Sequence, residues 1–165
     1  MGIEIERKFL VRSPSWQRDV GQTFDIRQGH LALTELSSTR VRIIDCQSAT
    51  LTVKSIKEGR RREEYEYPIP VWDAERLISW CRGSYVEKVR HEVVFDGMTW
   101  EVDVFSGEND GLVIAEVELD HVDQTFECPH WVGREVTDDR RYSNASLAMH
   151  PFGDWTFDCA PANIV

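Results

Sequence analysis

Short segments in which apolar and polar residues alternate at every second position dominate the chain. Turn-forming residues separate these segments, and neither a repeat nor a low-complexity linker divides them. Because successive side chains of a strand point to opposite faces, this alternation predicts an antiparallel sandwich or barrel. The expected strands cover residues 3–11, 24–33, 39–45, 50–56, 63–69, 86–95, 99–105 and 113–120.

Helical spacing is rarer than this alternation. Within residues 73–82, the apolar residues Leu77, Ile78 and Cys81 recur at helical intervals, and Asp73 is a candidate N-cap. Shorter helical segments are expected over residues 14–19, 131–135 and 143–149, the last with Ser143 as its cap. The predicted fold class is therefore α+β, mainly antiparallel β, with a few flanking helices.

The composition fits one domain with a core of its own, since 41% of the 165 residues are hydrophobic. We expect this domain over residues 1–155 and a loose tail over residues 156–165. The net charge of −10 opposes nucleic-acid binding, which usually needs a basic face. The charged N-terminus lacks the apolar core of a signal peptide, and no stretch approaches the roughly 18 apolar residues of a membrane span. We predict a cytoplasmic protein without nucleic-acid or membrane partners, and leave homodimerisation open.

Familiar site motifs are missing from the chain. The four cysteines form no C-x-x-C pair, so we expect reduced, mostly packed thiols and neither a zinc nor a redox site. The five histidines are scattered. Neither a nucleophile elbow nor a glycine-rich phosphate loop is present. The basic run Arg60, Arg61 and Arg62 is interpreted as a solvated hairpin turn that could also guide polyanions.

The polar face of the predicted strands is almost purely ionic. An ordinary half-buried sheet carries a loose mixture of neutral and charged polar residues on its solvent face. Here, eight acids and six bases lie in phase on seven strands. These residues are Glu4, Glu6, Lys8, Arg40, Arg42, Lys54, Glu64, Glu66, Lys88, Arg90, Glu101, Asp103, Glu116 and Glu118.

Two interpretations of this ionic face compete. It can be a solvated outer face whose ion pairs contribute only about 0–1 kcal/mol each. It can instead line a closed or nearly closed barrel whose outer apolar face is covered by helices. An ionic interior is costly unless ions and a charged ligand fill it. Paired carboxylates suit Mg²⁺ or Mn²⁺, and Arg and Lys suit phosphate, so a nucleoside triphosphate or an inorganic polyphosphate is indicated.

Residues 2–10 (GIEIERKFL) resemble the opening signature of the CYTH family, the triphosphate tunnel metalloenzymes. The match continues with VRI from 41, LTVK at 51–54, EYEYPIP at 64–70, EKVRH at 87–91, WEVDVF at 100–105, AEVEL at 115–119 and RYSNASLAMHPF at 141–152. This resemblance implies a closed eight-stranded antiparallel tunnel that binds a small-molecule triphosphate with Mg²⁺ or Mn²⁺. Its short bacterial-type members, the inorganic tripolyphosphatases, are the most similar.

The resemblance also implies roles for individual residues. The metal ligands would be Glu4, Glu6, Asp103, Glu116 and Glu118. The phosphate oxygens would be held by Lys8, Arg40, Arg42, Lys54, Lys88 and Arg90. The catalytic set would comprise Lys8, Lys54, Lys88 and Asp103. The remaining acids would either bind a second metal or orient the basic residues; they are Glu64, Glu66 and Glu101.

The chain departs from the family pattern at a few positions. Ile26 or His30 stands where relatives often carry Tyr, and Met149 stands where they carry Lys, on a helix expected to plug or cap the tunnel. The leading hypothesis is an inorganic triphosphatase. The alternatives are an adenylyl cyclase, a thiamine or nucleoside triphosphatase, a polyphosphate-binding module without activity, and a structural domain with charged outer sheets.

Overall fold

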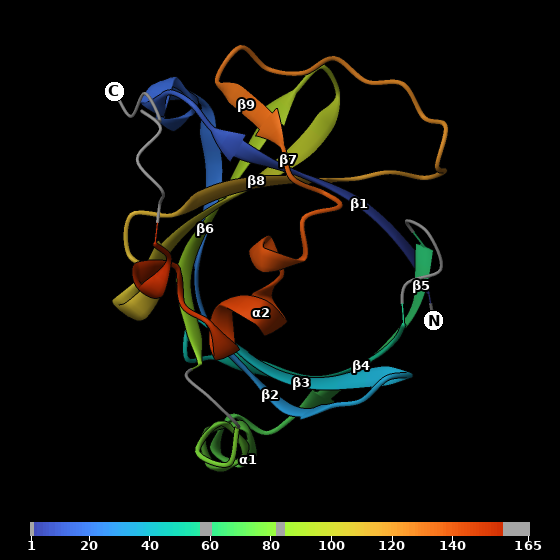
Figure 1. The fold of residues 1–165 in the computed structure, drawn as a ribbon, viewed down its shortest axis with the longest axis vertical. Coiled ribbons are helices and arrows are strands. Elements are labelled where there is room, and N and C mark those ends of the chain that lie inside the picture. Colours follow the sequence, from blue (N-terminus) through green and yellow to red (C-terminus); the bar gives the residue numbers. More distant parts are fainter. Residues whose placement is uncertain (1, 57–60, 82–84, 157–165) are drawn as a thin grey trace.

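The strands of this protein close into a barrel. The computed structural model describes residues 2–56, 61–81 and 85–156. One antiparallel sheet runs in the order β5-β4-β3-β2-β6-β7-β8-β1, and β5 pairs again with β1, which closes the ring (Figure 1). The strands are β1 Gly2–Val11, β2 Val20–Leu33, β3 Ser37–Ile44, β4 Ser48–Ser55, β5 Arg61–Ile69, β6 Val86–Phe95, β7 Met98–Ser106, β8 Val113–Glu118 and β9 Val132–Glu135.

β1 carries the closure because its two edges serve three strands. Residues Glu6–Leu10 pair with β8. The opposite edge pairs with β5 through Gly2–Ile5 and with β9 from Phe9 to Val11. β9 is therefore an extra strand outside the closed ring of eight, and the predicted closed eight-stranded barrel is confirmed.

The eight expected strands all form, with bounds that shift by a few residues. Two helix predictions need correction. Residues 131–135, expected to be helical, form β9, because the edge of β1 beyond β5 offers unpaired backbone groups. The helix α1 spans Val71–Ile78 and begins after Pro70, so Asp73 lies in its first turn and is not the N-cap. A carboxylate in the first turn still stabilises the helix, because it interacts favourably with the positive end of the helix dipole.

The other short helical segments agree with expectation. A 3₁₀ helix covers Pro14–Asp19, and α2 covers Asn144–Met149. The Ser143 hydroxyl accepts a hydrogen bond from the Ser146 amide at 3.1 Å, which satisfies one donor of the first turn of α2. Further 3₁₀ turns lie at Gly107–Asn109, Arg140–Tyr142 and Phe152–Asp154.

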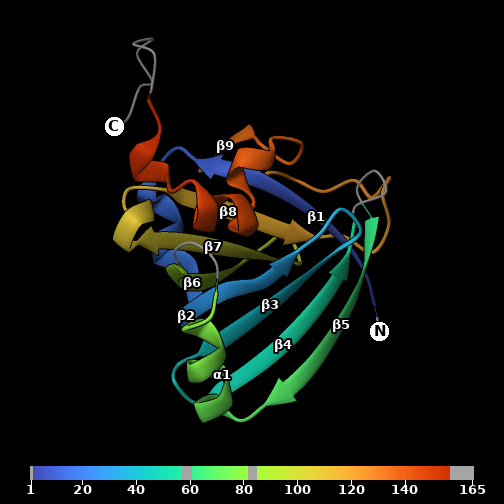
Figure 2. The same cartoon turned by 60° about the horizontal axis from the view of Figure 1, so that its bottom comes forward.

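Apolar side chains on the outside of the barrel are covered in two places. α1 packs Ala74 and Ile78 against Val41 and Ile43 of β3 (Figure 2). On the other side, Trp100 contacts the aromatic rings of Phe9, Phe126 and Trp131. This second cluster also holds Trp16 of the first 3₁₀ helix and Val132 of β9. The expectation that helices cover the outer face is thus met by α1 alone over one patch, while a 3₁₀ turn, β9 and residues 119–131 cover the other.

One end of the barrel interior is apolar and filled. On four strands, the inward-facing residues change from charged to apolar toward this end. The apolar residues there are Leu10, Val86, Phe105 and Ile114. α2 lies inside the ring of strands and packs Leu147 against this cluster (Figure 1). The apolar cluster therefore closes one end of the barrel and leaves an ionic chamber beside it.

The described thiols are less packed than expected. Cys46 and Cys128 are exposed and Cys81 is half-buried, and all three are free. Within the described part of the chain, no helix is long and apolar enough to cross a membrane. The predicted tail falls almost wholly in residues 157–165, outside the described residues.

Candidate active site

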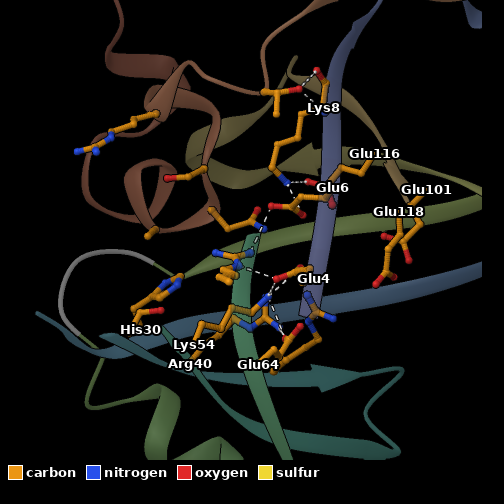
Figure 3. A pocket seen from close by; sticks show the side chains of 18 of the residues that line it. Glu4, Glu6, Lys8, His30, Arg40, Lys54, Glu64, Glu101, Glu116 and Glu118 are labelled. Atoms are coloured by element: carbon orange, nitrogen blue, oxygen red, sulfur yellow. Dashed lines mark hydrogen bonds and ion pairs between the residues drawn. The ribbon is translucent and has the colours of Figure 1, made fainter. Parts of the chain in front are cut away.

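The ionic chamber is a cavity of about 370 Å³ inside the barrel (Figure 3). Twelve of the fourteen in-phase charged residues line it. They are Glu4, Glu6, Lys8, Arg40, Arg42, Lys54, Glu64, Glu66, Arg90, Glu101, Glu116 and Glu118. The barrel interpretation of the sequence is therefore confirmed, since the alternation that buries Ile5 and Val41 outside turns the charged residues inward.

Glu4 lies at the centre of one cluster of ion pairs. Lys54 Nζ donates to both carboxylate oxygens of Glu4 at 3.0 Å, and Arg62 Nε donates to Glu4 Oε2 at 2.6 Å. Arg62 also lies 3.3 Å from Glu6. Burial would raise the pKa of Glu4, but Arg62 and Lys54 together lower it to about 2. Glu4 is thus ionised at neutral pH.

Lys8 connects two acids on neighbouring strands. It pairs with Glu116 directly across from it in the β1–β8 register, and with Glu6 at 3.2 Å. Burial would lower the pKa of Lys8, but Glu116 and Glu6 raise it above its ordinary value. For Glu116, Lys8, Lys88 and Arg90 overcome burial and hold the carboxyl pKa well below its usual range.

Two predicted site residues, Lys88 and Asp103, do not line the cavity. Asp103 is fully buried, pairs with Lys88 and accepts two hydrogen bonds from Arg90 at 2.7 Å. Burial and the neighbouring Arg90 lower the pKa of Lys88 to about 8. Arg90 reaches on to Glu116 at 3.1 Å and to Glu101. In this arrangement Asp103 and Lys88 fix the direction of Arg90.

The wall formed by β2 and β3 has an excess of positive charge. Arg40 lies 3.6 Å from the carboxylates of Glu64 and Glu66, and its Nε has no hydrogen-bond partner. Arg42 donates to Gln28 Oε1 at 3.2 Å and forms no ion pair among the described residues. Burial and Arg42 lower the pKa of Arg40 to about 9. Desolvated guanidinium groups without matched anions suit an anionic ligand.

The acids on β7 and β8 show the opposite imbalance. Glu118 forms no ion pair with any described residue, and burial and the carboxylates of Glu4 and Glu101 raise its pKa. Burial also raises the pKa of Glu101, against the effect of Arg90. The described residues include no group of three or more carboxylate, imidazole or thiol side chains placed to hold a metal ion. Mg²⁺ commonly takes only one or two carboxylates and completes its shell with water and substrate phosphates, so this oxygen donor set fits such an ion.

The structure adds residues to the predicted set. Arg62, interpreted from sequence as part of a turn, lies in β5 and points into the cavity. It stands two positions before Glu64, so extending the alternation backward would have found it. His30 of β2 also lines the cavity. The segment before α2 contributes Asp139, Arg140, Ser143 and Asn144, which no sequence period marks.

Met149 lies away from the ionic cavity. It is 45% exposed and borders a second hollow together with Leu31 and Leu33. α2 does plug the barrel, as expected, but through Leu147 and Ala148. Met149 itself is thus absent from the lining of the ionic cavity, although it shares the second hollow with His30.

Known proteins are similar to this chain in sequence and fold. The CYTH domain family model matches residues 2–148. An inorganic triphosphatase of Acetivibrio thermocellus is 43% identical over 153 residues, which cover 92% of this chain and 97% of that protein. An inorganic triphosphatase of Nitrosomonas europaea is 40% identical over 88% of this chain and 97% of its own length. The crystal structure of an inorganic triphosphatase superimposes with a TM-score of 0.65, at 37% identity, over 90% of this chain and 96% of that one.

Proposed function

The chain belongs to the CYTH domain family, and from this premise we propose that it hydrolyses inorganic tripolyphosphate inside the barrel with the help of Mg²⁺ or Mn²⁺. The observation that carries the proposal is the chamber inside the barrel in which a basic wall faces an acidic one. Basic side chains bind the oxygens of a phosphate chain, and carboxylates bind the divalent ions that accompany it.

The bases that line the cavity are proposed to bind the phosphate chain. Arg42 has no ion pair among the described residues, and Arg40 stays 3.6 Å from Glu64 and Glu66 with its Nε unpartnered, so both are well placed to hold phosphate oxygens. Lys8, Lys54 and Arg90 now pair with acids and would share their charge with the substrate. Held in this way, the terminal phosphoryl group can be oriented for in-line attack by water, which breaks the bridging P–O bond and releases phosphate and pyrophosphate.

The acids are proposed to hold the divalent ions, through Glu4, Glu6, Glu116 and Glu118. A bound divalent ion would neutralise phosphate charge and polarise the terminal phosphoryl group. Glu64 and Glu66 hold Arg40, and Glu101 holds Arg90, in the directions that the substrate needs. Because Asp103 and Lys88 are buried, pair with each other and do not line the cavity, and Asp103 accepts from Arg90, the part proposed for both is to position Arg90 and not to contact the substrate.

The lining of the cavity favours an inorganic substrate over a nucleotide. Among the described lining residues, His30 carries the single aromatic ring, and Val117 and Ala145 are the apolar ones. Adenine and thiazole rings are usually bound by apolar or aromatic groups. The described cavity offers little for either ring, which counts against an adenylyl cyclase and a thiamine triphosphatase.

A substrate panel tests the proposed activity. The protein is incubated with tripolyphosphate, ATP or thiamine triphosphate and with Mg²⁺ or Mn²⁺, and phosphate, pyrophosphate and cyclic AMP are measured. We expect phosphate release from tripolyphosphate to be the fastest reaction, and to stop when EDTA is added. Cyclic AMP formation from ATP would instead identify a cyclase, and binding of tripolyphosphate without turnover would identify a binding module.

Variants of the cavity connect the activity to the proposed site. Glu4→Gln and Lys54→Ala should each reduce turnover at least about 100-fold, as expected when a proposed metal ligand or a cation that contacts the reacting phosphate chain is lost. Circular dichroism should show that both variants keep the fold. Near-normal rates in both variants would contradict the assignment of the site, even if the wild-type protein is a triphosphatase.

A further inference from the structure

His30 is an unusual member of the cavity lining. It lies on β2 opposite Arg40 of β3 and is only 7% exposed. Its Nδ1 atom is buried and has no hydrogen-bond partner. In Figure 3 the imidazole stands beside Arg40 and Lys54 on the wall of the cavity. A buried polar atom without a partner is costly, unless a ligand or water satisfies it.

A second unpartnered polar atom lies on the same wall. Arg40 is 6% exposed, and its Nε lacks a hydrogen-bond partner while its Nη2 stays 3.6 Å from the acids of β5. The Arg42 guanidinium nearby has no ion pair among the described residues. With Gln28 Nε2 of β2, this wall thus combines three orphaned nitrogen atoms with a guanidinium that has no ion pair among the described residues. Glu4 and Asp103 elsewhere in the barrel are each held by two cations.

The charge state of His30 follows from its surroundings. Burial and the positive charges of Arg40, Lys54 and Arg62 lower its pKa to about 4. At neutral pH the imidazole is therefore uncharged, with one nitrogen that donates and one that accepts. A neutral donor can bind an anion in this position without adding a further positive charge to a crowded basic wall.

We propose that His30 is a substrate-contacting residue whose neutral imidazole donates a hydrogen bond to a phosphate oxygen of the chain that Arg40 holds. This inference rests on the proposed function, because it takes the ligand to be tripolyphosphate. It assigns to the β2–β3 wall one phosphate group, bound jointly by a guanidinium and an imidazole. The competing explanation is a buried imidazole that supports the wall by packing and does not respond to the ligand.

Nitrogen NMR of the histidine rings tests the contact directly. The ¹⁵N-labelled protein is titrated with tripolyphosphate in EDTA, where no turnover is expected, and again with Mg²⁺ and the imido analogue whose P–N–P bridges resist hydrolysis. We expect the ring nitrogen shifts of His30 to move and saturate with the ligand in at least one titration. His91 is the matched control, because it lies on the neighbouring strand β6 but contacts Trp16 outside the barrel.

Variants separate contact from packing. His30→Leu should weaken tripolyphosphate binding, measured by calorimetry, by about 10–100-fold, as expected for a lost hydrogen bond to a charged group. His30→Gln keeps a donor and should recover part of the affinity. KM should rise more than kcat falls, because the contact is made before the reaction. His91→Leu should leave both affinity and KM unchanged.

Several results would overturn the contact and leave the proposed function standing. One is a set of His30 ring signals that stays fixed in both titrations while backbone signals of other cavity strands move. Another is equal affinity in His30→Leu and wild type. A third is an equal loss in His30→Leu and His30→Gln together with a lowered melting temperature, which would identify a packing role. If wild-type protein neither binds nor hydrolyses tripolyphosphate, the proposed function fails and the contact with this ligand fails with it. The titration of wild-type protein decides the question even if His30→Leu does not fold.

Discussion

At the scale of single residues, the interior of this barrel is a network in which most charges have a counter-charge. Desolvation penalises each buried ion, and the partners offset that penalty only where geometry and hydrogen bonds are good. Asp103 meets this condition, with Lys88 and Arg90 on its two oxygens. The buried Arg40, whose Nε has no partner, does not, and the exposed Glu118 has no ion pair among the described residues; both lie on the cavity. The unbalanced residues, more than the balanced ones, indicate where a ligand belongs.

Arg62 should matter for activity although it lies in a basic run that resembles a solvated turn. Its side chain joins Glu4 and Glu6, so Arg62→Gln should misplace two proposed metal ligands. We expect kcat/KM for tripolyphosphate to fall by about 10–100-fold, a usual effect of losing a group that orients a metal ligand. Arg18→Gln, on the exposed side of the first 3₁₀ helix, is the control and should have no effect. Equal rates in both variants would show that the ion pairs of Arg62 with Glu4 and Glu6 do not contribute to activity.

Asp103 should matter first for stability. Asp103→Asn removes the charge that both Lys88 and Arg90 share, and leaves two buried cations without their central anion. Urea unfolding should show a loss of about 3–5 kcal/mol, as for other broken buried pairs. Asp123→Asn, at an exposed position, should stay within about 0.5 kcal/mol of wild type. If the two variants unfold at the same urea concentration, the buried pair contributes little.

At the scale of elements, α2 and the segment before it serve the barrel in two ways. Leu147 and Ala148 complete the apolar cluster that fills one end. Ser143 and Asn144, at the start of the same element, line the ionic cavity. The packing of α2 thus sets the depth of the chamber, and a change in the apolar plug should be felt at the site.

Leu147→Ala tests this coupling. Leu147 is fully buried, so its truncation should cost about 2–5 kcal/mol, through lost burial and the cavity left behind. We also expect KM for tripolyphosphate to rise, because the floor of the chamber loosens. Met149→Ala, two residues further along the same helix but half-exposed, should change neither quantity by much. A stability loss in Leu147→Ala without any change in KM would show that plug and site are independent.

At the scale of the whole molecule, the barrel should lose stability in acid in two steps. The pKa of His30 is lowered to about 4 in the folded protein. Between about pH 6.5 and 4 the imidazole is therefore protonated in the unfolded chain but not in the folded one, which lowers the free energy of unfolding as the pH falls. The pKa of Glu4 is lowered to about 2, so its contribution is present above about 4.5 and is lost as the pH falls toward 2. The pKa values of Glu101 and Glu118 are raised, so these two groups increase the stability of the folded state as the pH falls.

Urea midpoints between pH 7 and pH 3 measure this dependence. We expect the midpoint to fall throughout, and His30→Gln to flatten the curve between about pH 6.5 and 4, where the wild-type imidazole titrates only on unfolding. Glu4→Gln should flatten it below about pH 4.5. A curve of identical shape in all three proteins would mean that neither group titrates differently on folding.

Much of this arrangement is predictable because the strand period links fold and site. The same alternation that places Val41 and Ile43 under α1 places Arg40 and Arg42 inside the barrel, so one pattern predicts both. The prediction fails where tertiary contacts override local pattern. β9 forms because β1 offers an open edge. Asp103 and Lys88 keep the right phase but do not line the cavity, because both are buried in an ion-pair cluster with Arg90.

The sequence by itself determined the strands and the separation of each into an apolar and an ionic face, since both follow from side-chain type and a period of two. The closure of the barrel decided that the ionic face lines the interior. Only the tertiary structure decided which charges pair and which stay unmatched, because partners such as Arg62 and Glu4 are far apart in the chain. It also decided that α2 fills one end of the barrel, and that His30 joins the cavity with a buried nitrogen that has no partner. Those choices depend on distances between strands, which no local period encodes.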